Sequence, residues 1–370
     1  MNYFVLAGEK SGELHGANLI KAIIDKDPEA NFDFFGGDSM SEATGKSPLV
    51  HINQLDTFGF VGVALAYKKL LGFLKLCKNH LAQTKPDAVI LIDYSGFNMK
   101  VAKYAHEIGL TVHYYISPKL WVWNEKRVFK VKKYVDYMYC ILPFEIDFYR
   151  RFAYQADYVG NPLIDEIDNF IPNPDFLKQN KLDKKQTIAL LPGSRKQEIE
   201  HILSLMGEIL PQFNGYQFVI AGIKRFEEAF YRSFLPQNSD IKIVYDQTYD
   251  LLQHTEAAVV TSGTATLETA LFNIPEVIVY KANSLTYWIY KQLTKIKLVG
   301  LCNLIASDEV AIELIQNDFT VDNVAKELKA LLKGGARREL FFHKNKVVIE
   351  KVGGPGASKR TADLILQRTK

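Results

Sequence analysis

Short apolar runs, each long enough for one buried strand, alternate along the chain with longer segments in which apolar residues recur at helical spacing. This alternation is typical of βαβ units, in which parallel strands are joined by helices that cover the sheet. It predicts an α/β protein with two doubly wound parallel sheets. The expected strands of the first sheet are 3–6, 32–35, 88–93, 111–116, 137–142 and 156–159, and those of the second are 187–191, 217–221, 241–244, 257–260 and 276–280.

Residues 170–186 interrupt the alternation, because they are rich in Pro, Asn and Lys. We therefore expect an N-terminal domain over 1–168, a linker over 169–186 and a C-terminal domain over 187–350. A final helix over 351–370 is expected to cross back to the first domain or to a partner subunit, which leaves a homodimer open. Ligands of open parallel sheets bind at the carboxyl ends of the strands, so two such domains facing a cleft suit a reaction of two substrates.

The composition is that of an ordinary globular protein, since 48% of the 370 residues are hydrophobic and 24% are charged. A net charge of +3 is too small to indicate a nucleic-acid partner. The three cysteines form no Cys-x-x-Cys pair and the eight histidines no His-x-x-x-His pair, so neither a disulfide framework nor a metal site is expected. Without a signal-peptide pattern or an apolar run of about 20 residues, we expect a cytoplasmic chain.

Two loops after strands of the first half carry candidate chemistry. The first strand ends in GEKSGELHG, residues 8–16, whose glycines allow a ligand to approach the backbone before a helix begins. The spacing matches neither a dinucleotide fingerprint nor a phosphate loop of the Walker type, and a tight strand-to-helix turn explains it equally well. Asp93, at the end of AVILID, is placed to act as a general base in the cleft. Taken alone, the pattern favours an ordinary turn aspartate or helix N-cap at Asp93.

Two loops of the second half suggest phosphate binding. In LLPGSRKQE, Ser194 fits a capping box with Gln197, but Arg195 opposes the helix dipole and is better explained by a bound phosphate. In TSGTATLE, residues 261–268, hydroxyls and exposed N–H groups could cradle a diphosphate. Glu268 lies about one turn into that helix and could accept hydrogen bonds from ribose hydroxyls. An ordinary hydroxyl-rich helix start is the alternative.

The segment 55–81 combines an apolar face with four lysines and has no acidic residue after Asp56. Such a segment can dock on an anionic bilayer. A buried helix of the first domain is favoured unless the substrate is a lipid.

Nine segments in this order resemble the lipid-A-disaccharide synthase family, and together they span nearly the whole chain. They are GEKSGELHGA (8–17), LIDYSGFN (91–98), YYISPKLWVW (114–123), ILPFE (141–145), VGNPLID (159–165), LLPGSR (190–195), TSGTATLE (261–268), NLIA (303–306) and GGPGASKRTADLI (353–365). The resemblance implies a GT-B fold, two Rossmann-like domains facing a cleft. It also implies an inverting glycosyltransferase that joins UDP-2,3-diacylglucosamine to 2,3-diacylglucosamine 1-phosphate (lipid X), giving a β-1,6-linked disaccharide 1-phosphate and UDP.

By this resemblance Asp93 deprotonates the acceptor 6-hydroxyl, and Glu9 and His15 shape the acceptor side. No cofactor and no metal ion are implied, because Arg195 and helix N-termini would neutralise the leaving group. The residues expected to hold UDP are Ser194, Arg195, Ser262, Gly263, Thr264 and Glu268, together with Asn303 and Gln316, which are similar to polar positions of the family's donor site.

A diacylated substrate favours the membrane interpretation of 55–81, with peripheral attachment to the cytoplasmic face of the inner membrane. The residues expected at the bilayer are Phe60, Val61, Val63, Tyr67, Leu70 and Leu71. The sequence departs from the family's usual pattern at Glu13, Gly62, Lys119 and Asn161. Two alternatives stay open: another UDP-sugar enzyme on the same scaffold, such as a different GT-B transferase or a UDP-N-acetylglucosamine 2-epimerase, and a non-enzymatic peripheral membrane protein.

Overall fold

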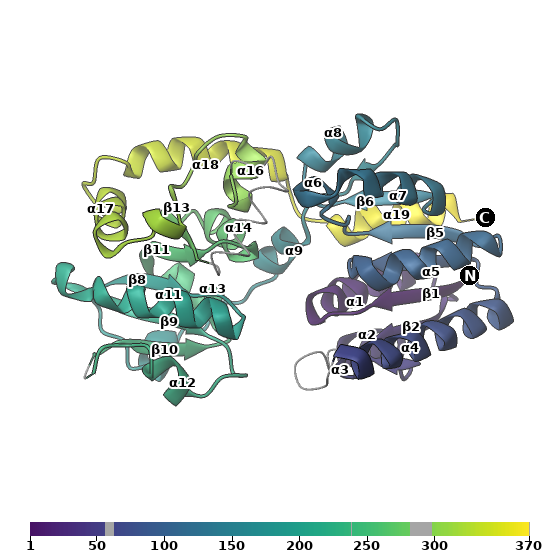
Figure 1. Cartoon of the computed structure of the whole chain (residues 1–370), viewed down its shortest axis with the longest axis horizontal. Coiled ribbons are helices and arrows are strands. Elements are labelled where there is room, and N and C mark those ends of the chain that lie inside the picture. Colours follow the sequence, from purple (N-terminus) through teal and green to yellow (C-terminus); the bar gives the residue numbers. More distant parts are fainter. Residues whose placement is uncertain (56–62, 238, 282–297, 370) are drawn as a thin grey trace. The chain divides into compact units, whose positions relative to one another are not determined.

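The computed structural model describes residues 1–55, 63–237, 239–281 and 298–369. The chain forms two compact units (Figure 1). Unit 1 comprises Met1–Asp165 and Gly354–Lys370, and unit 2 comprises Glu166–Gly353. Each unit is an α/β layer structure with its own sheet.

The sheet of unit 1 is parallel throughout its described strands, in the order β3-β2-β1-β4-β5-β6-β7. The strands are β1 (Asn2–Ala7), β2 (Asn31–Gly36), β3 (Val50–His51), β4 (Ala88–Ile92), β5 (Thr111–Tyr115), β6 (Tyr137–Cys140) and β7 (Asp157–Tyr158). The helices are α1 (Lys10–Ile24), α2 (Asp38–Thr44), α3 (Ile52–Leu55), α4 (Val63–Thr84), α5 (Ser95–Glu107), α6 (Leu120–Trp123), α7 (Val128–Tyr134), α8 (Phe144–Arg150), α9 (Pro162–Asp168), which runs into unit 2, and α19 (Ala357–Arg368).

The sheet of unit 2 is also parallel, in the order β10-β9-β8-β11-β12-β13. Its strands are β8 (Gln186–Leu191), β9 (Tyr216–Gly222), β10 (Lys242–Tyr245), β11 (Thr255–Thr261), β12 (Glu276–Tyr280) and β13 (Glu313–Ile315). The described helices are α10 (Phe176–Gln179), α11 (Lys196–Glu208), α12 (Glu228–Arg232), α13 (Thr248–Gln253), α14 (Thr264–Leu271), α16 (Leu301–Ala306), α17 (Val321–Leu331) and α18 (Arg338–Val352).

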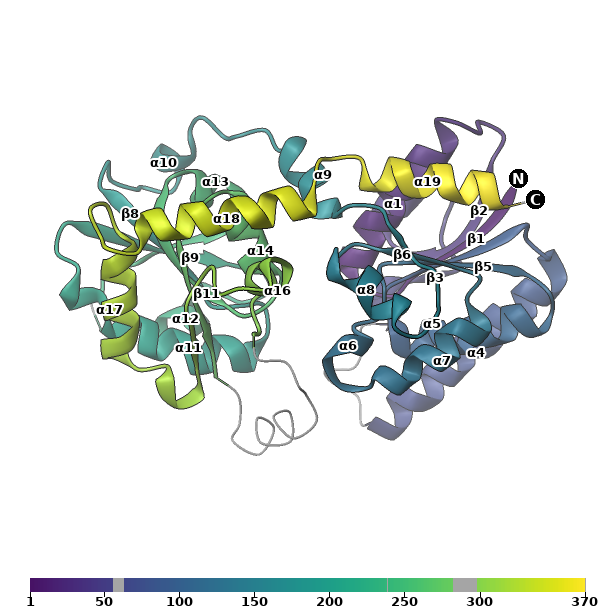
Figure 2. The same ribbon diagram turned by 90° about the horizontal axis from the view of Figure 1, so that it is seen from above.

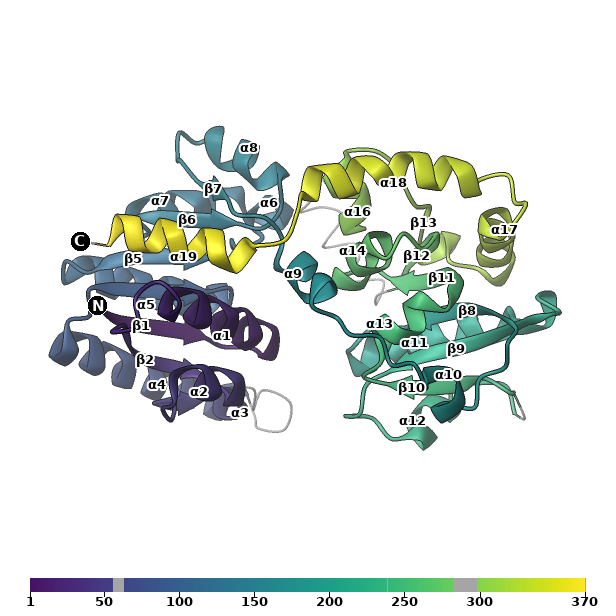
Figure 3. The same cartoon turned by 180° about the vertical axis from the view of Figure 1, so that it is seen from behind.

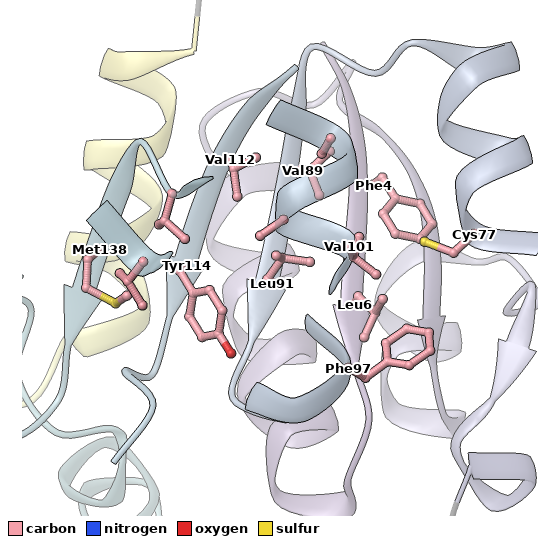
Figure 4. Close-up of a cluster of buried hydrophobic side chains, with 14 of the residues drawn as sticks. Phe4, Leu6, Cys77, Val89, Leu91, Phe97, Val101, Val112, Tyr114 and Met138 are labelled. Atoms are coloured by element: carbon pink, nitrogen blue, oxygen red, sulfur yellow. The ribbon is translucent and has the colours of Figure 1, made fainter. Parts of the chain in front are cut away.

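The central strands of unit 1 are mostly apolar because helices cover both faces of the sheet, and β4 is buried along its whole length. Successive residues of β1 alternate between two cores, with Phe4 and Leu6 on one face and Tyr3 and Val5 on the other. Figure 4 shows the first core, where strand side chains meet Cys77 of α4 and Phe97 and Val101 of α5. The second core is closed by α1 and α19. Buried strands of this kind produce the continuous apolar runs seen in the sequence.

Each sheet has a point where the strand order reverses. In unit 1, β1 pairs with both β2 and β4, and in unit 2, β8 pairs with both β9 and β11. Helices leave such a point toward opposite faces, and the crevice at the carboxyl ends is where open α/β sheets bind ligands. The loops that follow β1 and β4, and those that follow β8 and β11, are the loops expected to carry chemistry.

All eleven expected strands are present, with ends shifted by a few residues. The structure adds two that the pattern missed, β3 with 2 residues and β13 with 3, both at sheet edges. The segment expected as a linker contains α10, and Phe176 is buried in the core of unit 2. That segment therefore packs as part of unit 2.

The last helix, α19, packs on α1 of unit 1 (Figure 3). Arg360 holds it there, because its guanidinium donates to the carbonyl oxygens of Val159 (2.7 Å), Pro355 (2.7 Å) and Gly354 (3.1 Å). A Cβ atom on Gly160 would lie 2.2 Å from this guanidinium. The glycine-rich C-terminal motif thus ties the end of the chain to unit 1.

Within the described residues, no helix combines the length and the apolar character needed to cross a bilayer. The three cysteines, Cys77, Cys140 and Cys302, are all described and are buried free thiols.

Candidate active site

Asp93 follows β4 at the point where the strand order of unit 1 reverses, and its turn is held through main-chain atoms. Its N–H donates to the carbonyl of Tyr115 (3.0 Å), and its own carbonyl accepts from the Asn98 amide (2.9 Å) and from the Tyr114 hydroxyl. Asp93 and Tyr94 both have positive φ, +46° and +41°. Such angles cost about 1–3 kcal/mol per non-glycine residue, so the surrounding contacts must impose them.

Gly8, after β1, gives this turn the space it needs. A Cβ atom at residue 8 would lie 2.2 Å from the Tyr94 ring. The first glycine of GEKSGELHG therefore has a packing role beside Asp93.

Burial of Asp93 and the nearby charge of Glu9 raise the pKa of its carboxyl, whereas Lys119 and the Tyr94 N–H lower it. Glu9 is exposed at the N-cap of α1. A carboxylate with a raised pKa is a stronger base than an ordinary aspartate, as general-base catalysis requires. Lys119, one of the departures from the family pattern, favours the ionised form of this base.

His15 and Glu13 lie on α1 with different surroundings. Burial lowers the pKa of His15 to about 4, opposed by the charge of Asp165, so its imidazole is neutral near pH 7. The Glu13 side chain is buried and accepts the N–H of Ser39 (2.6 Å) in the first turn of α2. A Cβ atom on Gly37 would lie 2.7 Å from the Glu13 carboxyl. Glu13 thus satisfies the N-terminus of α2, which is a structural role.

Asn161 is another departure with a structural role. Its side chain donates to the carbonyl of Ile141 (3.2 Å) and accepts the N–H of Leu163 (3.0 Å). It is 2% exposed and supports the first turn of α9.

The loop after β8 presents Arg195 at the carboxyl edge of unit 2. Gly193 takes a φ of +99°, and α11 begins at Lys196. The expected capping box of Ser194 with Gln197 is therefore wrong by one residue, because Glu198 accepts the N–H of Arg195 (3.3 Å) and pairs with its guanidinium (2.7 Å). The Arg195 side chain is 81% exposed, so its outer face is open to an anion.

The loop after β9 adds a second guanidinium that the sequence did not indicate. Arg225 donates to the carbonyl of Ser194 (3.3 Å), which places it beside the Arg195 loop. Burial and the charge of Glu198 raise the pKa of Tyr280, at the end of β12, and the charge of Arg195 opposes the rise. Arg225 follows β9, which lies next to β8 in the sheet, and this neighbouring position is the signal that could have identified it.

The hydroxyl-rich loop after β11 is tied to the chain that precedes α16. Ser262 Oγ donates to the carbonyl of Val299 (3.1 Å). Thr266 Oγ1 donates to the carbonyl of Gly263 (2.9 Å) and accepts the N–H of Leu301 (3.0 Å). Gly263 and Thr264 are exposed at the start of α14, where unpaired backbone N–H groups can meet an anion.

Glu268 is reached by Tyr249, another residue that the sequence did not indicate. The Tyr249 hydroxyl donates to Glu268 (3.3 Å) and lies 3.5 Å from Glu166. Burial raises the pKa of Glu268, and the bond from Tyr249 opposes the rise. Tyr249 thereby fixes the side chain expected to bind ribose.

Asn303 and Gln316 differ in what they can offer a ligand. Asn303 is fully buried: its amide donates to Ala311 (2.7 Å) and Glu313 (2.8 Å), and its carbonyl accepts from Val310 (2.8 Å) and Ala311 (2.9 Å). All these bonds join Asn303 to β13 and the loop before it, so its side chain holds that loop in place. Gln316 has a φ of +56° and a buried Nε2 without a hydrogen-bond partner, which a polar ligand would satisfy.

Only part of the expected membrane segment is described. Phe60 and Val61 lie outside the described residues, and the side chains of Val63 and Tyr67 are not described. Leu70 is partly buried against the core of unit 1, whereas Leu71 is 43% exposed. The described part of α4 thus has both a core face and an exposed apolar face.

The fold and its loops define the class of protein. Two units, each an α/β structure with its own parallel sheet, are typical of the GT-B fold. Structures with this fold include UDP-GlcNAc 2-epimerase from Neisseria meningitidis bound to UDP-GlcNAc (TM-score 0.69, 11% identity, 100% of both chains) and MurG of Acinetobacter baumannii (TM-score 0.61, 14% identity, 99% of both chains).

Sequence comparison gives the family. Residues 3–364 match the family described as lipid-A-disaccharide synthetase. Relatives named lipid-A-disaccharide synthase include those of Trichlorobacter lovleyi (36% identity, 98% of this chain and 96% of the relative) and Coxiella burnetii strain Dugway 5J108-111 (35%, 92% and 91%). The chain belongs to the lipid-A-disaccharide synthase family.

Proposed function

We propose that the chain transfers 2,3-diacylglucosamine from UDP to the 6-hydroxyl of 2,3-diacylglucosamine 1-phosphate, forming a β-1,6-linked disaccharide 1-phosphate and UDP. The family's name supports lipid A disaccharide synthesis. The observation that carries the mechanism is Asp93, a carboxylate of raised pKa on a rigid turn at the reversal point of unit 1.

In this mechanism Asp93 takes the proton of the acceptor 6-hydroxyl as its oxygen attacks the anomeric carbon of the donor. The new C–O bond forms on the face opposite the breaking bond to the UDP phosphate, so the configuration inverts. Burial and the charge of Glu9 raise the pKa of Asp93 and strengthen it as a base, whereas the Lys119 charge favours its ionised form.

The donor is held by unit 2. Arg195 and the first N–H groups of α11 and α14 would receive the charge that develops on the leaving UDP, with no divalent ion required. Arg225 adds positive charge behind Ser194, and Glu268, fixed by Tyr249, would accept from the ribose hydroxyls. Gln316 would donate its unpaired amide hydrogens to the uridine or the sugar.

Peripheral membrane attachment is the second part of the proposal. The acyl chains of both substrates would stay in the bilayer while the sugars reach the enzyme, and the exposed Leu71 and Leu76 of α4 provide apolar contact. Replacing both leucines with serine should reduce sedimentation with anionic vesicles and leave thermal unfolding unchanged. Unchanged sedimentation would contradict this part.

The direct test is incubation of the purified protein with UDP-2,3-diacylglucosamine and lipid X, followed by mass spectrometry. A tetraacyl disaccharide 1-phosphate and an equal amount of UDP are expected. A parallel incubation with UDP-N-acetylglucosamine alone tests the epimerase activity of proteins with a similar fold, such as UDP-GlcNAc 2-epimerase. Conversion to the 2-epimer without disaccharide formation would overturn the proposal.

A further inference from the structure

A cavity of about 500 Å³ lies in unit 1 along α5, between α4 and α7. These three helices cover the same face of the sheet (Figure 2). The cavity is a groove that follows α5 from Gly96 to Glu107, and every residue that lines it is described. None of the residues expected in catalysis or in UDP binding lines this cavity.

The groove is strongly cationic. Its lining contains Lys78, Lys100, Lys103, Arg127 and Lys130 against one acid, Glu107, so five positive and one negative charge give a net +4. The acid pairs with Lys103 (3.7 Å). Like charges gathered in a concave site attract a multivalent anion more strongly than the same charges spread over a surface.

The walls between these charges are apolar. Leu74, Met99, Leu120 and Val131 line the groove together with Tyr104 and Tyr134. The Lys78 ammonium lies 4.9 Å from the Tyr104 ring centroid, so at least one cation is held over an aromatic wall. A ligand that suits both features carries an anionic group and an apolar portion.

One end of the groove lies next to the proposed base. Gly96 is three residues after Asp93, and a Cβ atom there would meet nothing within 4 Å. Arg127 is near enough to Tyr114 for its charge to act on that phenol, and the Tyr114 hydroxyl donates to the carbonyl of Asp93. An anion at this end of the groove would therefore lie close to the turn that carries Asp93, as expected for a group of the molecule whose hydroxyl meets Asp93.

We propose that this groove binds the phosphate of the phosphorylated, acylated acceptor, with Lys100, Arg127 and Lys130 as its cationic partners and the apolar walls in contact with the adjoining acyl chain. The identity of this acceptor rests on the proposed function. A phosphate monoester carries about −1.5 to −2 charges at pH 7, which matches a net +4 lining. The same phosphate chemistry occurs in the headgroups of an anionic bilayer, so the experiment must separate the two sources.

The test compares two double variants that remove equal charge. Lys100→Gln with Lys130→Gln removes two exposed lysines of the groove, whereas Lys126→Gln with Lys132→Gln removes two exposed lysines of the same region that do not line it. All are assayed in neutral detergent micelles, with lipid X or with 2,3-diacylglucosamine, which lacks the phosphate. Thermal unfolding verifies that each variant is folded.

We expect the groove variant to raise KM for lipid X about tenfold, because each lost contact is a charge-assisted hydrogen bond. The KM for the UDP-sugar donor and the KM for the dephosphorylated acceptor should stay at the wild-type value. The Lys126 and Lys132 variant should match the wild type with both acceptors.

Three results would overturn the inference: an equal rise in KM for both acceptors, an equal effect of the matched control, or an unchanged KM for lipid X. If an unchanged KM accompanies reduced sedimentation with phosphatidylglycerol vesicles, the groove meets bilayer headgroups. Equilibrium binding of lipid X in micelles keeps this test independent of turnover. Wild-type protein that binds lipid X through the groove but forms no disaccharide would contradict the proposed function alone.

Discussion

Replacing Asp93 with asparagine should remove nearly all turnover and leave the fold in place. The contacts that fix the turn bind the main chain of Asp93: its N–H donates to Tyr115, and its carbonyl accepts from Tyr114 and Asn98. Asparagine has almost the same shape as aspartate and tolerates a positive φ well, so the φ of +46° can be kept. The change therefore removes the proposed base and little else.

The expected loss follows from what a positioned base contributes, about 10²–10⁴-fold in rate, or about 3–5 kcal/mol of barrier. The free energy of unfolding of the variant, unlike its turnover, should not fall. Burial and Glu9 raise the pKa of Asp93 above its unfolded value, so the folded state binds the proton more tightly. The stability of the wild type therefore falls as pH rises from the unfolded pKa through the folded pKa of this carboxyl. A neutral amide avoids this loss, so the free energy of unfolding at pH 7 should be unchanged or higher.

The assay combines initial rates at saturating donor, urea unfolding at pH 7 and calorimetric titration with UDP. Glu29→Gln, the same chemical change at an exposed position, is the matched control and should leave all three measurements unchanged. A kcat for Asp93→Asn within tenfold of the wild type would remove Asp93 as the base. Loss of UDP affinity and stability together with turnover would show that the aspartate is structural.

Three further predictions concern other residues of the two units. Arg195→Ala should weaken UDP binding at least about tenfold in calorimetry, since a charge-assisted contact is lost, and unchanged affinity would exclude it from the donor site. Gly8→Ala should cost about 1–3 kcal/mol in urea unfolding through overlap with Tyr94, whereas Gly72→Ala, inside α4 and with no atom within 4 Å of its Cβ, should raise stability by up to about 1 kcal/mol. His15 should titrate near pH 4 by NMR, and stability should fall as pH drops from about 6.5 toward 4, by about 3 kcal/mol at most; a midpoint near 6.5 would refute its burial.

Most of the fold could be predicted because parallel strands covered on both faces leave unbroken apolar runs. The runs at β1, β4, β8 and β11 were sufficient to place the four loops of the candidate site. The short edge strands β3 and β13 were not expected, since two or three residues carry no period, whereas β7, which is equally short, lies within the expected strand 156–159. Phe176 shows the converse limit, because a core side chain inside a polar stretch makes a compact segment resemble a linker.

The candidate site could be predicted only where one loop carries the chemistry. Asp93 and Arg195 stand out in their own loops, but Arg225 and Tyr249 lie in ordinary polar stretches. They join the site through the strand order, which brings Arg225 beside Ser194, and through the contact of Tyr249 with Glu268. The separation of these residues along the sequence does not indicate that they are in contact.

Hydroxyls and amides that the sequence suggests as ligand contacts can instead hold the backbone of a loop. Glu313 accepts the N–H groups of Val299 (2.9 Å) and Gly300 (2.8 Å), and Asn303 donates to Glu313 (2.8 Å). The loop fixed in this way receives Ser262 Oγ at the carbonyl of Val299. Burial raises the pKa of Glu313, and these N–H donors oppose the rise. The exposed N–H groups at the start of α14 are thus held in place by side chains behind them. Polar residue type alone therefore overstates how many side chains in this region are available to a ligand.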